Sequence, residues 1–120
     1  MELITIISAR KVLESFADKE DINARLAYWM TKFIAKTQTD YDFYISERKK
    51  IYDKYAERES DGAYTVSEDK VANFREDIQS LEQAPAEDPG IKFNLSELSA
   101  ELKLSMRQMY PLLDFIDEDK

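Results

Sequence analysis

One stretch of the chain carries oxygen-bearing side chains at the spacing of a calcium-binding loop. Counted from Glu57, carboxylates stand at positions 1, 3, 5 and 12, and a glycine stands at position 6. EF-hand loops use these positions to surround Ca²⁺ with oxygen ligands and to make a sharp turn. The candidate ligands are Glu57, Glu59, Asp61 and Glu68. This alternative predicts a calcium-dependent rise in melting temperature that Asp61→Ala and Glu68→Ala abolish.

The loop departs from the EF-hand pattern at its most demanding position. Position 1 requires aspartate, whereas Glu57 is one methylene longer, and the chain offers no second loop for pairing. A solvated acidic turn after a helix explains the same residues. We therefore predict that no metal is bound.

Few residues are available for catalysis. The chain has no Cys and no His, which excludes thiolate nucleophiles, the commonest general base and serine–histidine triads. A hydrolase would need paired carboxylates or an oxygen-only magnesium site. The acidic clusters that could supply one are Glu68-Asp69, Glu76-Asp77 and Asp114 with Asp117-Glu118-Asp119. Adjacent acids on helices usually face solvent, so we predict no enzymatic activity and no cofactor.

The charge is acidic overall and unevenly placed. The 120 residues carry 17 Lys and Arg against 25 Asp and Glu, a net charge of −8. Residues 1–58 are nearly balanced, so the excess lies in residues 59–120. This charge disfavours direct binding of nucleic acid, whose affinity depends on phosphate contacts. The acidic half either keeps the protein soluble or imitates a phosphate backbone for a nucleic-acid enzyme.

One local basic patch interrupts this acidity. It consists of Arg48-Lys49-Lys50 with Lys54 and Arg58. Acidic residues follow at three- and four-residue spacings, which predicts pairing along the surface of a helix. No apolar run approaches the ~18 residues of a membrane span, and residues 1–7 do not resemble a signal peptide. We expect a cytoplasmic protein that does not enter membranes.

The elements that would position these residues are mostly helical. We predict a first helix from Ile6 to Ala17, while residues 1–7 fit either a strand or a helix. From an N-cap at Asp21, a long helix is predicted over residues 22–57, because neither Gly nor Pro interrupts it and its apolar residues recur every eleven positions. Such a helix would be about 54 Å long and would overhang a compact domain. Either it breaks at Thr37–Asp40 or its overhang packs on something else.

The predicted long helix is rich in aromatic residues. One interpretation places these rings in the protein's own core. The other makes some of them a dimer or partner surface. The candidate interaction residues are Tyr41, Tyr44, Tyr52, Tyr55 and Trp29.

The second half is predicted to hold shorter elements. Tyr64–Val66 and Ile91–Phe93 are candidate strands that could pair with each other. A helix capped by Ser67 should run to about Gln83, followed by a linker over residues 84–90 and a short helical turn. Ser105 and Gln108 form a capping-box pair for a last helix, which Pro111 should kink or delay.

The order of these pieces resembles short helical proteins encoded in phages and prophages of low-GC Gram-positive bacteria, a family largely of unknown function. The matching segments are Ala24–Tyr28, Glu47–Tyr55, Asp61–Val66, Val71–Phe74, Ile91–Phe93 and Pro111–Ile116. Genes of this kind often lie near tail or lysis modules. The resemblance implies a structural or assembly role and carries no catalytic residues.

Together these observations predict a mainly α single domain over residues 1–120: a helical bundle with one long helix, three or four shorter helices and a minimal two-stranded β pairing. The expected role is that of a non-enzymatic phage or prophage interaction protein, in virion (tail) assembly or as an accessory subunit. Its partner would be a phage structural protein, a host protein or a second copy in a homodimer. The alternative is an acidic inhibitor of a host nucleic-acid enzyme, an anti-defence protein acting by nucleic-acid mimicry.

Overall fold

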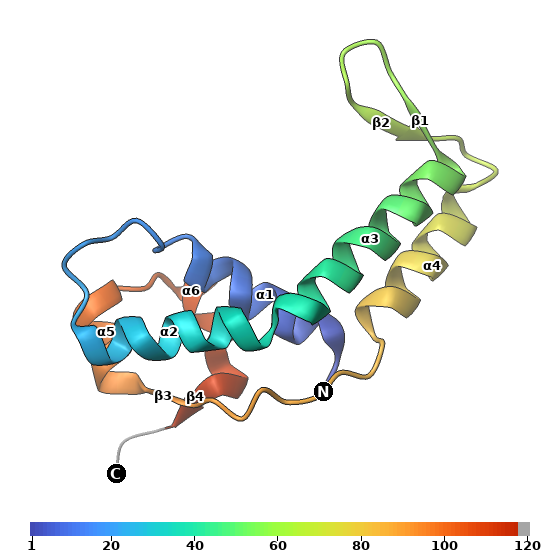
Figure 1. Cartoon of the computed structure of the whole chain (residues 1–120). Helices are drawn as coiled ribbons and strands as arrows, with labels where there is room; N and C mark the ends of the chain where they lie inside the picture. Colours follow the sequence, from blue (N-terminus) through green and yellow to red (C-terminus); the bar gives the residue numbers. More distant parts are fainter. Residues whose placement is uncertain (118–120) are drawn as a thin grey trace.

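The computed structural model describes residues 1–117 and consists of a lobe and a projecting arm (Figure 1). The lobe contains α1 (Leu3–Glu14), α2 (Ala24–Lys36), β3 (Phe93–Asn94), α5 (Leu95–Leu102), α6 (Met106–Met109), the 3₁₀ helix η1 (Tyr110–Phe115) and β4 (Ile116–Asp117). The arm contains α3 (Gln38–Tyr55), β1 (Ala56–Arg58), β2 (Tyr64–Val66) and α4 (Val71–Glu82). The mainly helical class predicted from sequence is confirmed.

The molecule is elongated. Its principal extents are 51 × 31 × 25 Å and its radius of gyration is 17.0 Å, against about 14 Å for a compact chain of this length. The arm accounts for the difference: α3 and α4 lie side by side and carry the β1–β2 hairpin away from the lobe (Figure 1).

The main core lies within the lobe. Phe33 of α2 is fully buried and meets Phe115 of η1 edge-on, with ring centroids 5.0 Å apart, and Phe93 of β3 at 6.1 Å. α1 is the central element, because it contacts α2, α3, α4 and η1. A second, smaller cluster of Leu3, Ile7 and Leu81 joins α1 to the base of the arm.

The single long helix predicted over residues 22–57 is present as two consecutive helices, α2 and α3, which meet at Thr37. The chain thus takes the first of the two predicted alternatives. Thr37 is buried, with φ −100° and ψ 7°, and its hydroxyl donates to the carbonyl of Phe33 at 2.8 Å. The guanidinium of Arg10 donates to the carbonyl of Ile34 at 2.6 Å and so binds the end of α2 from outside.

Several helix ends differ from the prediction by a few residues. α1 begins at Leu3 rather than Ile6, and α4 begins at Val71 after a turn that starts at Ser67. The N-cap of α2 is Asn23 and not Asp21, because the Asn23 side chain accepts from the amide of Leu26 at 2.8 Å.

The end of the chain follows the prediction closely. Ser105 and Gln108 form the predicted capping box at the start of α6. Pro111 then lies in the first turn of η1. Proline lacks an amide hydrogen and is tolerated there. The last helix, predicted to be kinked or delayed, instead changes from α to 3₁₀ at Tyr110.

The predicted pairing between Tyr64–Val66 and Ile91–Phe93 is wrong. β2 instead pairs antiparallel with β1, and β3 pairs parallel with β4. β1 is close to β2 in sequence, so a hairpin closes at little cost in chain entropy. Gly62 makes its turn possible, since its φ of +88° strains any residue with a Cβ.

The linker over residues 84–90 is attached to the beginning of the chain. The amide of Leu3 donates to the carbonyl of Ala84, and the amide of Ala86 donates to that of Met1, both at 2.8 Å. Glu2 and Pro85 form an isolated β-bridge. The ambiguity of residues 1–7 is thereby settled: Glu2 pairs as in a strand, and the helix begins one residue later.

Candidate functional site

The candidate calcium loop is a β-hairpin in which two of the four acidic side chains accept hydrogen bonds from the hairpin itself. The carboxylate of Asp61 accepts from the amide of Ala63 at 3.0 Å, and that of Glu59 accepts from the Thr65 hydroxyl at 2.8 Å. Over residues 1–117, no three acidic side chains converge in the manner of metal ligands. The candidates Glu57, Glu59, Asp61 and Glu68 are therefore not brought together.

Two of the predicted interaction tyrosines hold the arm together. The ring of Tyr52 meets that of Phe74 on α4, with centroids 5.2 Å apart. Tyr55 contacts the same phenyl ring at 6.3 Å, and its hydroxyl donates to Asp77 at 2.8 Å. These rings pack α3 against α4, but Tyr52 and Tyr55 stay half-buried and belong to neither core cluster.

The other two tyrosines lie where the arm meets the lobe. Tyr41 and Tyr44 pack against the cluster of Leu3, Ile7 and Leu81. The guanidinium of Arg10 stands over the Tyr41 ring, 4.6 Å from its centroid. Burial, and secondarily the charge of Glu82, raises the pKa of the Tyr44 hydroxyl above its usual range. That tyrosine therefore stays neutral and keeps its packing to higher pH than an exposed one.

Trp29 lies apart from these four residues. It is partly exposed on α2 and meets Tyr28 edge-on, with ring centroids 5.2 Å apart. The structure thus divides the five predicted interaction residues among three places: the arm, its base and the outer side of α2.

A concave surface, here called the elbow, lies between α1 and α3. One hollow of ≈ 430 Å³ is lined by both helices, including Ile4, Ser8 and Lys11 of α1 and Tyr44 of α3. A second hollow of ≈ 440 Å³ continues it along α3 to Tyr64 of the hairpin. Ile45 and Arg48 line both hollows. The break at Thr37 creates the elbow, because it sets the arm at an angle to the lobe (Figure 1).

The elbow carries positive charge that the described part of the chain does not neutralise. Lys50 pairs with Glu47 at 3.0 Å along α3, as predicted, whereas Lys54 approaches Asp77 of α4 at 3.9 Å rather than an acidic residue of its own helix. Within residues 1–117, however, Lys11, Arg48 and Lys49 form no ion pair. Surface pairing is therefore the wrong interpretation for Arg48 and Lys49.

Apolar and aromatic side chains stand among these cations. Ile45 is 43% exposed and Tyr64 is 50% exposed. Arg48 contacts the Tyr52 ring with its guanidinium 4.6 Å from the centroid. Sequence reasoning missed Lys11, Ile45 and Tyr64 as surface residues, because nothing in their spacing shows that α1 and the hairpin flank α3.

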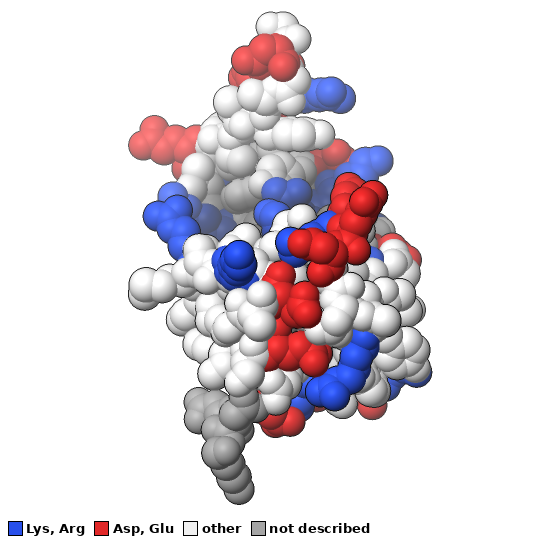
Figure 2. Space-filling model, turned by 90° about the vertical axis from the view of Figure 1, so that its left-hand side faces the viewer, with Lys and Arg blue, Asp and Glu red and all other residues white. Residues whose placement is uncertain are grey.

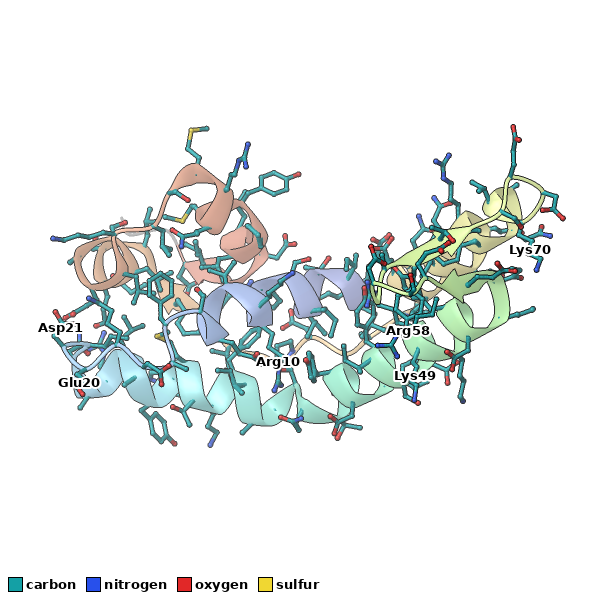
Figure 3. All side chains as sticks on the ribbon, turned by 90° about the horizontal axis from the view of Figure 1, so that it is seen from above. Arg10, Glu20, Asp21, Lys49, Arg58 and Lys70 are labelled. Carbon is teal, nitrogen blue, oxygen red and sulfur yellow. The ribbon has the colours of Figure 1, made fainter. Side chains whose placement is uncertain are left out.

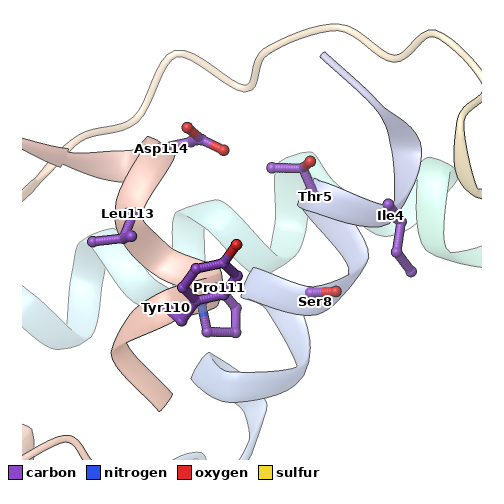
Figure 4. Close-up of a pocket in the computed structure, with 7 residues that line it drawn as sticks. All are labelled: Ile4, Thr5, Ser8, Tyr110, Pro111, Leu113 and Asp114. Atoms are coloured by element: carbon purple, nitrogen blue, oxygen red, sulfur yellow. The ribbon is translucent and has the colours of Figure 1, made fainter. Parts of the chain in front are cut away.

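A stripe of exposed apolar residues borders the elbow on its lobe side. Met106 is 90% exposed, Tyr110 77% and Leu113 55%. Tyr110 and Leu113 line a notch against α1 together with Ile4, Ser8 and Asp114 (Figure 4). Since Ile4 and Ser8 also line the elbow, the stripe and the elbow form one continuous surface across α1.

The far end of the lobe is acidic. Acidic side chains form a band across this end (Figure 2). Glu20 and Asp21 lie there, at the opposite end of the molecule from Lys70, whereas Lys49 lies on the arm between the two ends (Figure 3). Glu20 and Asp21 belong to the nearly balanced first half of the sequence, so the acidic residues at this end do not all come from residues 59–120. Asp21 pairs with Lys19 at 2.8 Å.

Comparison with known proteins identifies no family. The chain matches no family model, and no curated protein or solved structure is significantly similar to it. The phage resemblance accordingly remains a prediction. Within residues 1–117, no helix combines the length and apolar character needed to cross a membrane.

Proposed function

We propose that this chain is a non-enzymatic interaction protein and that the elbow is the surface on which it holds its partner. One observation carries the proposal. In a concave surface of an otherwise acidic protein, three cations that form no ion pair with any of residues 1–117 surround exposed apolar side chains. Protein interfaces combine an apolar, aromatic centre with polar residues at the rim, and Arg and Tyr are enriched in them.

The setting implied by the phage resemblance is virion assembly, as a tail or accessory component. The elongated shape supports this role, because an arm that reaches beyond a lobe can join two components. The interface would be largely apolar, with Ile45 and Tyr64 at its centre and the cations fixing its register. Its binding should therefore tolerate salt.

An affinity pull-down tests the proposal. Tagged protein is exposed to lysates of infected and uninfected host cells, washed at low and high salt, and the captured proteins are identified by mass spectrometry. We expect phage-encoded proteins, either a phage structural protein or untagged copies of this chain, to be retained at high salt and to be lost with Ile45→Ser and Arg48→Ser. The matched control is Phe43→Ser, which changes a residue of α3 that is 51% exposed and lies outside both hollows. Equal capture by all variants would show that the elbow is not the binding surface.

The acidic band favours a second candidate, an inhibitor that imitates a phosphate backbone (Figure 2). Such a protein would capture a host nuclease or polymerase at low salt only, and DNA or RNA would compete for it. Charge reversal at Glu20 and Asp21 would then abolish capture, while Ile45→Ser would leave it unchanged. The same pull-down therefore separates the two candidates.

A further inference from the structure

The stripe of Met106, Tyr110 and Leu113 exposes more apolar surface than is usual for a protein surface without a partner. Its residues are spaced four and three apart, so they follow one side of α6 and η1. All three are large, and each exposes more than half of its surface. Large exposed apolar side chains gathered in one place mark interaction sites rather than ordinary surface.

The charge beside the stripe is opposite to that of the elbow. Residues 106–117 contain two acidic residues, Asp114 and Asp117, and one basic residue, Arg107. Asp114 lines the notch next to Tyr110 and Leu113 and forms no ion pair within residues 1–117. The elbow offers Lys11, Arg48 and Lys49, and its one acidic lining residue, Glu14, is bound to Arg10. Stripe and elbow are thus complementary in charge and in apolar character.

We infer that the occupant of the elbow is a second copy of this chain, which inserts its stripe there in a two-fold symmetric dimer. The inference rests on the elbow of the proposed function and names its partner. In one copy the stripe lies beside its own elbow, on the other side of Ile4 and Ser8, and cannot fill it. Two copies can bring this face together around a two-fold axis that lies in the plane of the interface and passes close to Ile4 and Ser8. Each stripe then lies over the other copy's elbow.

This arrangement satisfies the requirement of an isologous interface, in which the same surface of both copies is used and every contact occurs twice. Tyr110 and Leu113 would meet Ile45 and Tyr64, and Asp114 would lie near Arg48 or Lys49. The net charge of −8 on each copy opposes association in general. The apolar centre drives the dimer, and the local ion pairs select its register.

Sedimentation equilibrium across protein concentrations tests the inference. We expect a monomer–dimer equilibrium in the wild type and a dissociation constant at least about tenfold higher for Leu113→Ser and for Ile45→Ser. Because both side chains are exposed, circular dichroism and thermal melting should show intact folding. Phe43→Ser is the matched control and should dimerise like the wild type.

A charge exchange identifies the register. Arg48→Asp alone and Asp114→Arg alone should each weaken the dimer, because each puts like charges in contact. The double variant should recover part of the lost affinity. If the two changes have additive effects on the free energy of dimer dissociation, the pairing of stripe with elbow is wrong.

The absence of Cys permits a direct test of the symmetry axis. In Ser8→Cys, the two introduced thiols face each other across the axis, so mild oxidation should give a covalent dimer rapidly. Ser80→Cys, which introduces an exposed thiol on α4, should give little. Equal rates for both variants would overturn the axis.

Failure of this inference leaves the proposed function separately testable. A wild-type protein that is monomeric at all concentrations excludes the second copy as occupant. If Ile45→Ser still abolishes capture of a lysate protein in that case, the elbow remains the binding surface and only the identity of its partner changes. A dimer that Leu113→Ser and Ile45→Ser leave intact would show that self-association uses another surface.

Discussion

At the scale of single residues, Arg10 makes the contacts that hold the junction between α2 and α3. It is 4% exposed, and its guanidinium donates to Ile34 at 2.6 Å, to Thr37 at 3.1 Å and to Gln38 at 2.7 Å, besides pairing with Glu14. A buried cation is tolerated only when its donors are satisfied in this way. One side chain of α1 thereby fixes the junction between α2 and α3 (Figure 3).

Replacing Arg10 by methionine should lower the free energy of unfolding by about 2–3 kcal/mol, because the hydrogen bonds that its buried charged group donates to Ile34, Thr37 and Gln38 are lost. Urea denaturation measures the change. The neighbouring Lys11→Met is the control, since Lys11 is exposed and forms no ion pair within residues 1–117. Equal urea midpoints for Arg10→Met and wild type would show that the junction does not depend on this residue.

At the scale of elements, capping and turn residues set most boundaries. Asn23 caps α2, Asn94 caps α5, and Ser105 caps α6 with the help of Gln108. Each side chain satisfies an amide that the first turn of a helix leaves without a partner. Asn23 also donates to Glu101 of α5 at 2.7 Å, so one residue both starts α2 and ties it to α5.

Asn23→Ala should therefore destabilise the protein by about 1 kcal/mol, the usual value of an N-cap, whereas Asp21→Ala should have almost no effect. Asn23→Ser separates the contribution of the N-cap from that of the hydrogen bond to Glu101, because serine keeps a capping oxygen but does not reach Glu101. Thermal or chemical denaturation of the three variants gives the comparison. A larger loss of stability for Asp21→Ala than for Asn23→Ala would show that Asp21 is the N-cap, as the sequence suggested.

At the scale of the whole molecule, the lobe and the arm are stabilised differently. The lobe has a continuous buried core, whereas α3 has no fully buried residue and α4 has only Leu81. The outer arm depends on edge-to-face contacts of Tyr52 with Tyr64 and Phe74. Segments with few buried contacts open more readily than a core.

Phe74→Ala should therefore loosen the arm and leave the lobe intact. Hydrogen exchange followed by mass spectrometry should show protection in α3 and α4 falling by about tenfold or more, with little change in α2 and α5. Phe43→Ala is a suitable control, because its ring lies exposed on α3 and belongs to neither core cluster. A uniform loss of protection in both parts would mean that arm and lobe unfold as one unit.

The sequence by itself determined the helical class, the linker, the capping box at Ser105 and the interruption of the last helix near Pro111. These features arise from backbone preferences and contacts within a few residues, which are legible in the chain order. The tertiary structure alone decided that Arg10 holds the break at Thr37, that β2 pairs with β1, and that Lys11 lies across a hollow from Arg48. These depend on which distant segments pack together. The elbow depends on such packing, because its two walls are α1 and α3. No local sequence pattern shows that these two helices lie against each other.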